Sequence, residues 1–322
     1  MNFKPIIVVA GEPNSVFFEI FFKALKKKKI KSPIILIASC KLLKLQMKKM
    51  GFKKAIKLIT ISDIKKTKLN NKSINLFDIN YNQKKPFEKI SSRSNNYINK
   101  SFDIALKILE MKITNKLING PVSKKYFFKK NFLGMTEYLA NKNKVDKYAM
   151  LIYNKNLSVS PITTHLPLKQ VSNNINKRLI KDKITLINQF YKKFFRKKPN
   201  IAVTGLNPHC ESIDSFNEDQ KIIKPSIDSL IKLGYKISGP FAADTIFQKK
   251  NRQSYDVIVG MYHDQVLAPI KTLFEFNAIN ITLGLPFIRV SPDHGPNEKM
   301  LGKKISNPKS LIESLTFLDF QK

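Results

Sequence analysis

Residues 6–38 read IIVVAGEPNSVFFEIFFKALKKKKIKSPIILIA and contain two apolar runs separated by an amphipathic segment. The runs Ile6–Ala10 and Ile34–Ala38 are rich in β-branched residues, as buried strands are, whereas Val16–Lys27 has the spacing of a helix. The same alternation continues to residue 61. A β-α-β-α-β order predicts a parallel sheet covered by helices, so we expect an α/β fold.

The rest of the chain continues this alternation after one interruption. Residues 63–100 are rich in Lys, Asn and Ser with weak periodicity, so we expect an excursion over the surface there. The runs Ala149–Tyr153 and Leu157–Thr164 predict a hairpin. Further strands are expected at Ile201–Gly205, Asp256–Gly260 and Ile279–Leu283, and helices near Lys181–Phe195, Asp219–Leu233, Gln265–Phe274 and Ser310–Phe317.

At 322 residues the chain is long for a single core, so two domains that share a cleft are expected. We place the first at residues 1–130 and the second at 131–296. The tail, 297–322, is expected to return to the first domain.

The net charge of +35 is of the kind found in nucleic-acid-binding proteins. However, five of the 58 basic residues are Arg, and the lysines spread along the chain instead of forming one stripe. We therefore predict a solvated basic surface and no nucleic-acid partner.

Two cysteines, Cys40 and Cys210, cannot form a disulfide framework, which favours a reducing compartment. The first apolar run stops at Glu12, too short for a signal peptide, and no later run reaches the length of a membrane span. A cytoplasmic location without membrane association is expected.

Every histidine follows directly on a β-type run; these residues are His165, His209, His263 and His294. In open α/β sheets, ligands bind just beyond the carboxyl ends of the strands. One histidine there is more often structural, but several together favour a shared site. Because imidazole is a common metal ligand, their placement predicts a divalent metal site, although their spacing carries no ligand motif.

Two carboxylates, Asp264 and Asp293, adjoin His263 and His294. They could orient an imidazole or cap a loop, and the sequence leaves both roles open.

Groups suited to anions form a second set, comprising Lys271, Asn280, Arg289 and the turn at residues 134–136. Arg289 stands out because arginine is scarce in this chain, and either an ion pair or a phosphate contact would explain it. No G-x-G-x-x-G string and no P-loop occurs, so a dinucleotide would be held without a Rossmann fingerprint.

Short motifs in order along the chain resemble the 4-hydroxythreonine-4-phosphate dehydrogenase family of vitamin B6 synthesis. They are GEP at 11–13, NGPVSK at 119–124, TEY at 136–138, TTHLPL at 163–168, GLNPH at 205–209, GPFAADTIF at 239–247, MYHDQ at 261–265, NITLGLPFIR at 280–289 and DHG at 293–295. The resemblance implies two α/β/α domains around a cleft, as in isocitrate and isopropylmalate dehydrogenases. It also implies a homodimer whose active site lies at the subunit interface.

The resemblance assigns roles to single residues. It gives the metal to His165, His209 and His263, the last supplied by the partner subunit. It gives the substrate to Thr136, the Met135 position, Lys271, Asn280 and Arg289. We add Asp244 as a polar contact near the metal, Asp264 and His294 as residues beside the ligands, and Asp244 or Lys271 as candidate proton acceptors, with a metal-bound water as the third possibility.

The implied reaction is the oxidation of 4-phosphohydroxy-L-threonine by NAD or NADP with one divalent ion per site, zinc, magnesium or cobalt. Decarboxylation would then give 3-amino-2-oxopropyl phosphate. Two alternatives stay open: a sister dehydrogenase acting on a 4-phosphorylated threonate or erythronate, and a degenerate basic protein that binds polyanions.

Three features depart from the family pattern. Met135 stands where the family usually has a histidine, and a thioether cannot donate a hydrogen bond. Bulky residues fill GEPNSVFFE, where the family usually has small ones. Cys210 adjoins His209, and we interpret it as a small buried residue and not as a ligand.

Overall fold

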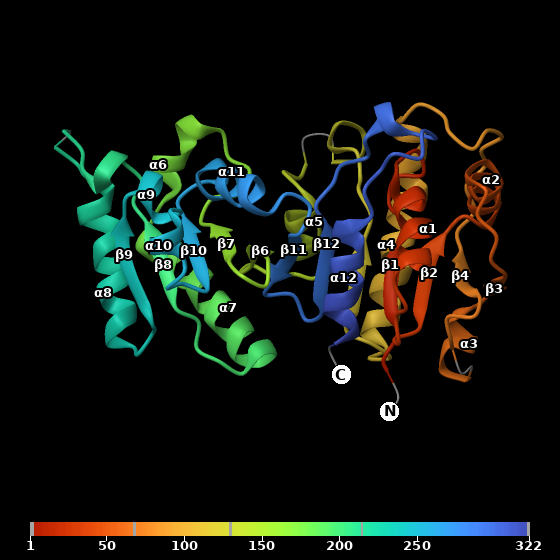
Figure 1. Cartoon of the computed structure of the whole chain (residues 1–322), viewed down its shortest axis with the longest axis horizontal. Helices are drawn as coiled ribbons and strands as arrows, with labels where there is room; N and C mark the ends of the chain where they lie inside the picture. The colour runs from red at the N-terminus through yellow and green to blue at the C-terminus, as the bar shows by residue number, and fades with distance from the viewer. Residues whose placement is uncertain (1–2, 67–68, 129–130, 214, 321–322) are drawn as a thin grey trace. The chain divides into compact units, whose positions relative to one another are not determined.

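The computed structural model describes residues 3–66, 69–128, 131–213 and 215–320, and the chain divides into two compact units. The first unit comprises Met1–Phe132 and Pro286–Lys322, and the second comprises Leu133–Leu285. Figure 1 shows both chain ends in the first unit, where red and dark blue segments lie together. Each unit combines a sheet with helices, which confirms the predicted α/β class.

The first unit is built on a parallel sheet with the strand order β3-β4-β2-β1-β5-β12. Its strands are β1 (Ile6–Val9), β2 (Ile34–Ala38), β3 (Ile56–Leu58), β4 (Ile74–Asp78), β5 (Lys116–Asn119) and β12 (Ile288–Pro292). Its helices are α1 (Phe17–Lys27), α2 (Cys40–Met50), α3 (Ile61–Lys66), α4 (Asn95–Glu110) and α12 (Lys309–Asp319), with short helical turns at Ser92–Ser94, Lys124–Phe128 and Glu298–Met300.

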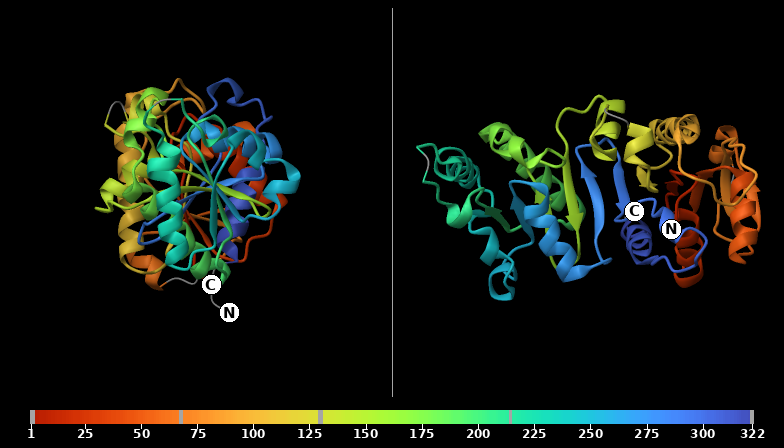
Figure 2. Two further views of the ribbon diagram at one scale, coloured as in Figure 1. Left: turned by 90° about the vertical axis from the view of Figure 1, so that its left-hand side faces the viewer. Right: turned by 90° about the horizontal axis from the view of Figure 1, so that it is seen from above.

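The helices of the first unit cover both faces of its sheet. Helices α1 and α12 pack together, with α2 beside α1, whereas α4 lies on the opposite face (Figure 2). Strands β1 and β2 are buried along their whole length, as their uninterrupted apolar runs predict for a sheet covered on both sides.

The loops after β1 and β5 approach each other closely. The Gly120 N–H donates to the Val9 carbonyl at 2.7 Å, and the Glu12 N–H donates to the Pro121 carbonyl at 2.8 Å. A Cβ on Gly120 would lie 2.2 Å from the Ala10 oxygen, so only glycine fits there. This contact explains the glycine of the NGP string.

The region 63–100 differs from the sequence-based expectation. Residues 63–100 do not form a simple surface excursion, because Ile74–Asp78 forms β4 between β2 and β3. The buried Asn75 side chain donates to the carbonyls of Ile34 and Asn70, so a polar residue occupies a core position in this strand. That polar residue weakens the apolar pattern from which strands are predicted.

The second unit has the strand order β11-β6-β7-β10-β8-β9, in which β6 pairs antiparallel with β11 and β7 and the remaining pairs are parallel. Its strands are β6 (Ala149–Tyr153), β7 (Ser158–Pro161), β8 (Ile201–Thr204), β9 (Ile237–Phe241), β10 (Val257–Gly260) and β11 (Ile279–Leu283). Its helices are α5 (Met135–Lys142), α6 (Val171–Asn174), α7 (Lys177–Phe195), α8 (Lys224–Lys232), α9 (Ala243–Ile246), α10 (Lys249–Arg252) and α11 (His263–Phe274), with helical turns at Leu168–Gln170, Pro208–Cys210 and Asp219–Ile223. The β6–β7 pairing confirms the predicted hairpin.

Helix α11 and the short α9 pack on one face of this sheet, where Ile246, Val266 and Ile270 join strand residues in one buried cluster. Helices α7 and α8 pack together and contact β6, β9 and β11. In Figure 2 the α7 and α11 helices lie on opposite faces of the sheet.

The unit boundaries can be set beside the expected domains. The expected break after residue 130 adjoins residues 129–130, which lie outside the described part of the chain. At the second break, residues 286–296 belong to the first unit, because β12 pairs with β5. Helix α12 belongs to the first unit. Within the described ranges, no helix is both long and apolar enough to cross a membrane.

Candidate active site

Three of the histidines follow neighbouring strands of the second unit. His165 lies beyond β7, His263 begins the helix after β10, and His209 lies in the turn after β8. Because β7, β10 and β8 are adjacent and parallel, their carboxyl ends meet at one edge of the sheet. The predicted placement of these histidines at strand ends is confirmed.

His165 and His263 approach each other within the same chain. Their ring centroids lie 5.7 Å apart with the planes tilted by 36°. Nδ1 of His263 contacts Oδ1 of Asp264 at 2.6 Å, and Nδ1 of His165 lies 3.5 Å from Oε1 of Glu137. Each imidazole therefore has a carboxylate at Nδ1. The expectation that a partner subunit supplies His263 stays a prediction.

Glu137 was not singled out from the sequence, although it stands in the TEY motif. Its side chain is 12% exposed, and Oε1 accepts a hydrogen bond from the Thr164 hydroxyl at 2.9 Å. Burial on its own raises the pKa of Glu137, but hydrogen bonds from His165, a backbone N–H and Thr164 outweigh it and lower the pKa below its usual value. Glu137 is therefore a buried carboxylate that stays charged at neutral pH.

His209 is exposed, and the described residues contain no group of three His, Cys, Asp or Glu side chains able to hold a metal ion. Its backbone is left-handed with φ of 55°, as is that of Cys210 with φ of 63°. Asp219 secures this turn by accepting hydrogen bonds from the backbone N–H groups of Leu206 and Asn207. Cys210 is part-buried, and burial, with smaller contributions from Asp219 and Asp244, raises the pKa of its thiol.

The predicted substrate residues of the second unit surround β11 and α11. The buried Thr136 hydroxyl lies 3.3 Å from that of Thr282, and Met135 begins α5. Oδ1 of Asn280 is buried and has no hydrogen-bond partner among the described residues. Lys271 is exposed on α11, the helix that begins at His263.

The remaining predicted residues lie in the first unit. Arg289 is only 2% exposed, and its Nε donates to Oδ1 of Asn119 at 2.7 Å. Nδ1 of His294 lies 3.1 Å from the Gly295 carbonyl, and burial lowers the pKa of this imidazole. Asp293 donates its backbone N–H to the Ser310 hydroxyl. That contact is consistent with a role in ordering the loop.

The loop after β1 holds a second buried carboxylate that the sequence did not mark as functional. Glu12 is 2% exposed and accepts hydrogen bonds from the Ser94 hydroxyl at 2.9 Å and the Asn14 N–H at 3.3 Å. Burial raises the pKa of Glu12 to about 6, because these hydrogen bonds compensate only in part.

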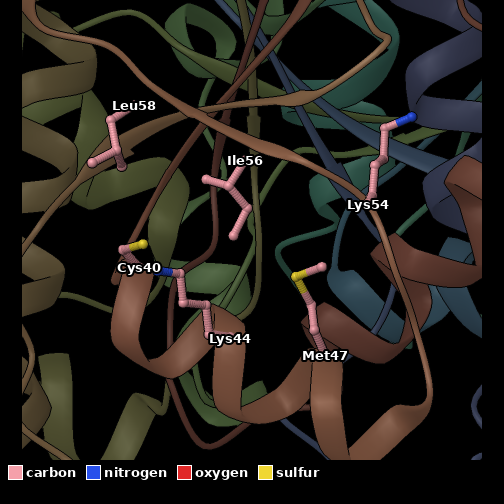
Figure 3. A pocket seen from close by; sticks show the side chains of 6 residues that line it. All are labelled: Cys40, Lys44, Met47, Lys54, Ile56 and Leu58. Carbon is pink, nitrogen blue, oxygen red and sulfur yellow. The ribbon is translucent and has the colours of Figure 1, made fainter.

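A cavity of about 400 Å³ lies elsewhere in the first unit, between α2 and β3 (Figure 3). Its lining combines two lysines with a thiol and apolar side chains: Cys40, Lys44, Met47, Lys54, Ile56 and Leu58. In Figure 3 the amine end of Lys44 is turned toward Cys40. None of the candidate site residues lines this cavity.

The two-unit α/β frame has the fold of isocitrate dehydrogenase. The solved isocitrate dehydrogenase of Methylococcus capsulatus matches with a TM-score of 0.52 at 9% identity, over 98% of this chain and 84% of that one, which shows a shared fold alone. More specifically, the chain belongs to the family described as pyridoxal phosphate biosynthetic protein PdxA, which matches residues 29–318. The resemblance drawn from the motifs is confirmed.

Relatives with an assigned activity share most of the chain. A protein of Sulfurihydrogenibium sp. (strain YO3AOP1), named 4-hydroxythreonine-4-phosphate dehydrogenase, is 38% identical over 316 residues, which cover 96% of each chain. A solved 4-hydroxythreonine-4-phosphate dehydrogenase from Klebsiella pneumoniae superposes with a TM-score of 0.83 at 26% identity, over 98% of both chains. The predicted dehydrogenase family is confirmed.

Proposed function

We propose that this chain oxidises 4-phosphohydroxy-L-threonine with NAD or NADP and a divalent metal. Loss of carbon dioxide from the product then gives 3-amino-2-oxopropyl phosphate for pyridoxal phosphate synthesis. Family membership supports the substrate class. The structural observation that carries the proposal is the His165–His263 pair, in which each imidazole has a carboxylate at Nδ1.

The two imidazoles fit a shared metal ion. Their ring centroids lie 5.7 Å apart, so both rings could contribute a nitrogen to one divalent ion. Metal-binding histidines usually hold a carboxylate or carbonyl at the other ring nitrogen, as Glu137 and Asp264 are placed to do. We therefore assign His165 and His263 as ligands through Nε2 and His209 as the third.

Positioning of the substrate falls to groups that bind anions. The unpaired Oδ1 of Asn280 is an acceptor for a hydroxyl or ammonium group, and the Thr136 hydroxyl is a donor. Lys271 and Arg289 supply positive charge for the phosphate or the carboxylate. The Nε contact with Asn119 fixes the plane of the Arg289 guanidinium, so its orientation is set before substrate binds.

The bound metal would act as a Lewis acid on the hydroxyl and the later enolate. A bound nicotinamide would accept the hydride from the hydroxyl carbon, and the hydroxyl proton would pass to one of the two candidate bases, Asp244 and Lys271, which are both exposed. Cleavage of the bond to the carboxylate would release carbon dioxide, and protonation would give the amino ketone.

We infer that the complete site needs a homodimer. The described part of one chain pairs His165 with His263, so in this proposal the partner subunit supplies His209, where the resemblance implied His263. Mixing inactive His209→Ala and His263→Ala subunits should restore activity, because each mixed dimer would contain one intact site. If all three ligands came from one chain, the mixture would stay inactive.

The substrate is tested by following NADH at 340 nm with 4-phosphohydroxy-L-threonine and NAD, with and without a chelator. Turnover that chelation abolishes is the expected result. The His263→Ala variant should lose several kcal/mol of charge stabilisation, roughly a thousandfold in rate. No turnover of this substrate by metal-loaded protein would overturn the proposal.

The sister reaction is favoured by one observation, Met135 at the first position of α5. The missing donor is worth about 1.5 to 3 kcal/mol, or roughly ten- to a hundredfold in affinity. Turnover of a 4-phosphorylated threonate or erythronate, without turnover of phosphohydroxythreonine, would assign the chain to that reaction. A vitamin B6 requirement after gene deletion would support our first assignment.

The polyanion-binding alternative rests on the +35 charge alone, and membership of a dehydrogenase family argues against it. Tight binding to RNA with a steep dependence on salt, in a protein without turnover, would revive it. The cytoplasmic location stays a prediction.

A further inference from the structure

We propose that Glu137 is the positioning residue of His165: its carboxylate accepts the Nδ1 proton, so Nε2 keeps its lone pair for a metal ion. This inference rests on the proposed metal-dependent function and adds a residue to it. The two residues are 28 positions apart in sequence and meet only because α5 lies beside the loop after β7.

The contact is isolated from other partners. Nδ1 of His165 and Oε2 of Glu137 are both buried, and neither has a hydrogen-bond partner in the described ranges. Oε1 of Glu137 lies 3.5 Å from Nδ1, a loose contact that binding of a metal on the far side of the ring would tighten. The imidazole thus faces a carboxylate with spare acceptor capacity.

One neighbour, Thr164, holds the carboxylate in place. Thr164 is the residue next to His165. Its hydroxyl donates a hydrogen bond to Oε1 of Glu137 at 2.9 Å. Lys183, the nearby buried cation, donates to the Tyr148 carbonyl. The hydrogen bond from Thr164 orients Glu137 toward the loop of His165.

Gly134 packs against the same edge of the imidazole as Glu137. A Cβ at this position would lie 2.8 Å from Cε1 of His165 and 3.0 Å from Oε2 of Glu137. The backbone thus packs against the ring edge that carries Nδ1 and the carboxylate, and leaves no room for a side chain. This packing restricts rotation of the ring that would turn Nδ1 toward the metal.

A neutral imidazole carries its proton on one nitrogen only, and the partner of that nitrogen decides which one. A buried carboxylate at Nδ1 selects the Nδ1–H tautomer and makes Nε2 a better donor to a metal. Loss of such a partner typically weakens metal binding by 10- to 100-fold. Asp264 makes the same kind of contact to His263, but its side chain is 84% exposed, so solvent weakens the interaction.

The test measures metal affinity and the His165 tautomer in the full chain. Protein stripped with a chelator is titrated with Zn²⁺ in competition with a chromophoric chelator, and ¹⁵N-histidine NMR reads the tautomers of the four histidines. Glu137→Gln should weaken Zn²⁺ binding by roughly 10- to 100-fold and shift His165 away from the Nδ1–H form. Asp264→Asn should change affinity by less than about threefold, because its contact is exposed.

Glu12→Gln is the matched control, because it makes the same substitution in a buried carboxylate of the other unit, and it should leave Zn²⁺ affinity unchanged. If Glu137→Gln does not fold, Glu137→Asp keeps the charge, and its partial retention of affinity and of the Nδ1–H form would carry the test. Unchanged affinity and an unchanged tautomer in a folded Glu137→Gln protein would overturn the inference. His165→Ala separates the two proposals: if it too binds Zn²⁺ normally, the proposed metal site itself is wrong.

Discussion

Each unit contains a buried glutamate, Glu12 in the first unit and Glu137 in the second. The pKa values of these two carboxyl groups shift in opposite directions. Glu12 of the first unit accepts hydrogen bonds from one hydroxyl and one backbone N–H, and its pKa is raised to about 6. Glu137 of the second unit has His165, a backbone N–H and Thr164 as partners, and its pKa is lowered. Burial raises the pKa in both cases, so the partners decide the charge.

This difference shows which of the two carboxylates can orient an imidazole in a catalytic site. A glutamate kept ionised can hold a neighbouring imidazole in one tautomer, whereas one that is protonated below pH 6 loses that capacity as the pH falls. The second unit therefore carries a carboxylate suited to orienting a metal ligand. The first unit carries Glu12, whose raised pKa makes the stability of the fold depend on pH.

The largest expected effect concerns Glu12 and stability. A group whose folded-state pKa lies above its unfolded value of 4.5 stabilises the fold below that value, and the stabilisation is lost as the pH rises through about 6. The shift corresponds to about 2 kcal/mol. Glu12→Gln should therefore be more stable than the parent by about 2 kcal/mol at pH 8 and equal to it at pH 4, measured by urea unfolding.

A constant difference between the two proteins across this pH range would show that Glu12 does not titrate as described. Glu137→Gln provides the contrast, because it should not gain stability at pH 8. A gain there would erase the distinction between the two carboxylates.

The second prediction concerns Gly134→Ala. The added Cβ would press on Cε1 of His165, and such overpacking typically costs about 1 to 3 kcal/mol. We expect Zn²⁺ affinity to fall by about tenfold as the ring is displaced. Gly295→Ala is the control, because a Cβ there lies 3.7 Å from its nearest neighbour, Oδ1 of Asn297. Equal affinities in the two alanine variants would contradict the close packing around His165.

The smallest effect is expected for Thr164→Val. It removes one hydrogen bond to the Glu137 carboxylate, worth about 1 kcal/mol, so Zn²⁺ affinity should fall by roughly fivefold. Ser94→Ala removes the corresponding hydroxyl from Glu12 and should leave Zn²⁺ affinity unchanged while raising the pKa of Glu12 further. A similar loss of affinity in both variants would indicate a general loss of stability.

Apolar runs and motif strings allowed most of the fold to be predicted, because buried parallel strands are apolar along their length. Strand β4 was not predicted because its second residue, Asn75, is buried and finds its hydrogen-bond partners in other segments. The assignment of residues 286–296 to the first unit depends on pairing between β12 and β5, which no local pattern marks.

The strand-end histidines could be located from the sequence because each follows a β-type run directly. Glu137 could not, because its contact with His165 depends on how α5 packs against a loop 28 residues further on. The conformation of the His209 turn was equally hidden, since it depends on left-handed backbone angles and on Asp219. These features arise from tertiary packing.

The central claim is that His165 and His263 hold the metal on which oxidation depends. The most direct measurement titrates Zn²⁺ or Co²⁺ into stripped protein and follows metal binding and NADH formation from 4-phosphohydroxy-L-threonine in the same samples. Both signals should reach half-saturation at the same metal concentration, and His165→Ala should lose both. NADH formation by stripped protein that the added metal does not change would contradict the account.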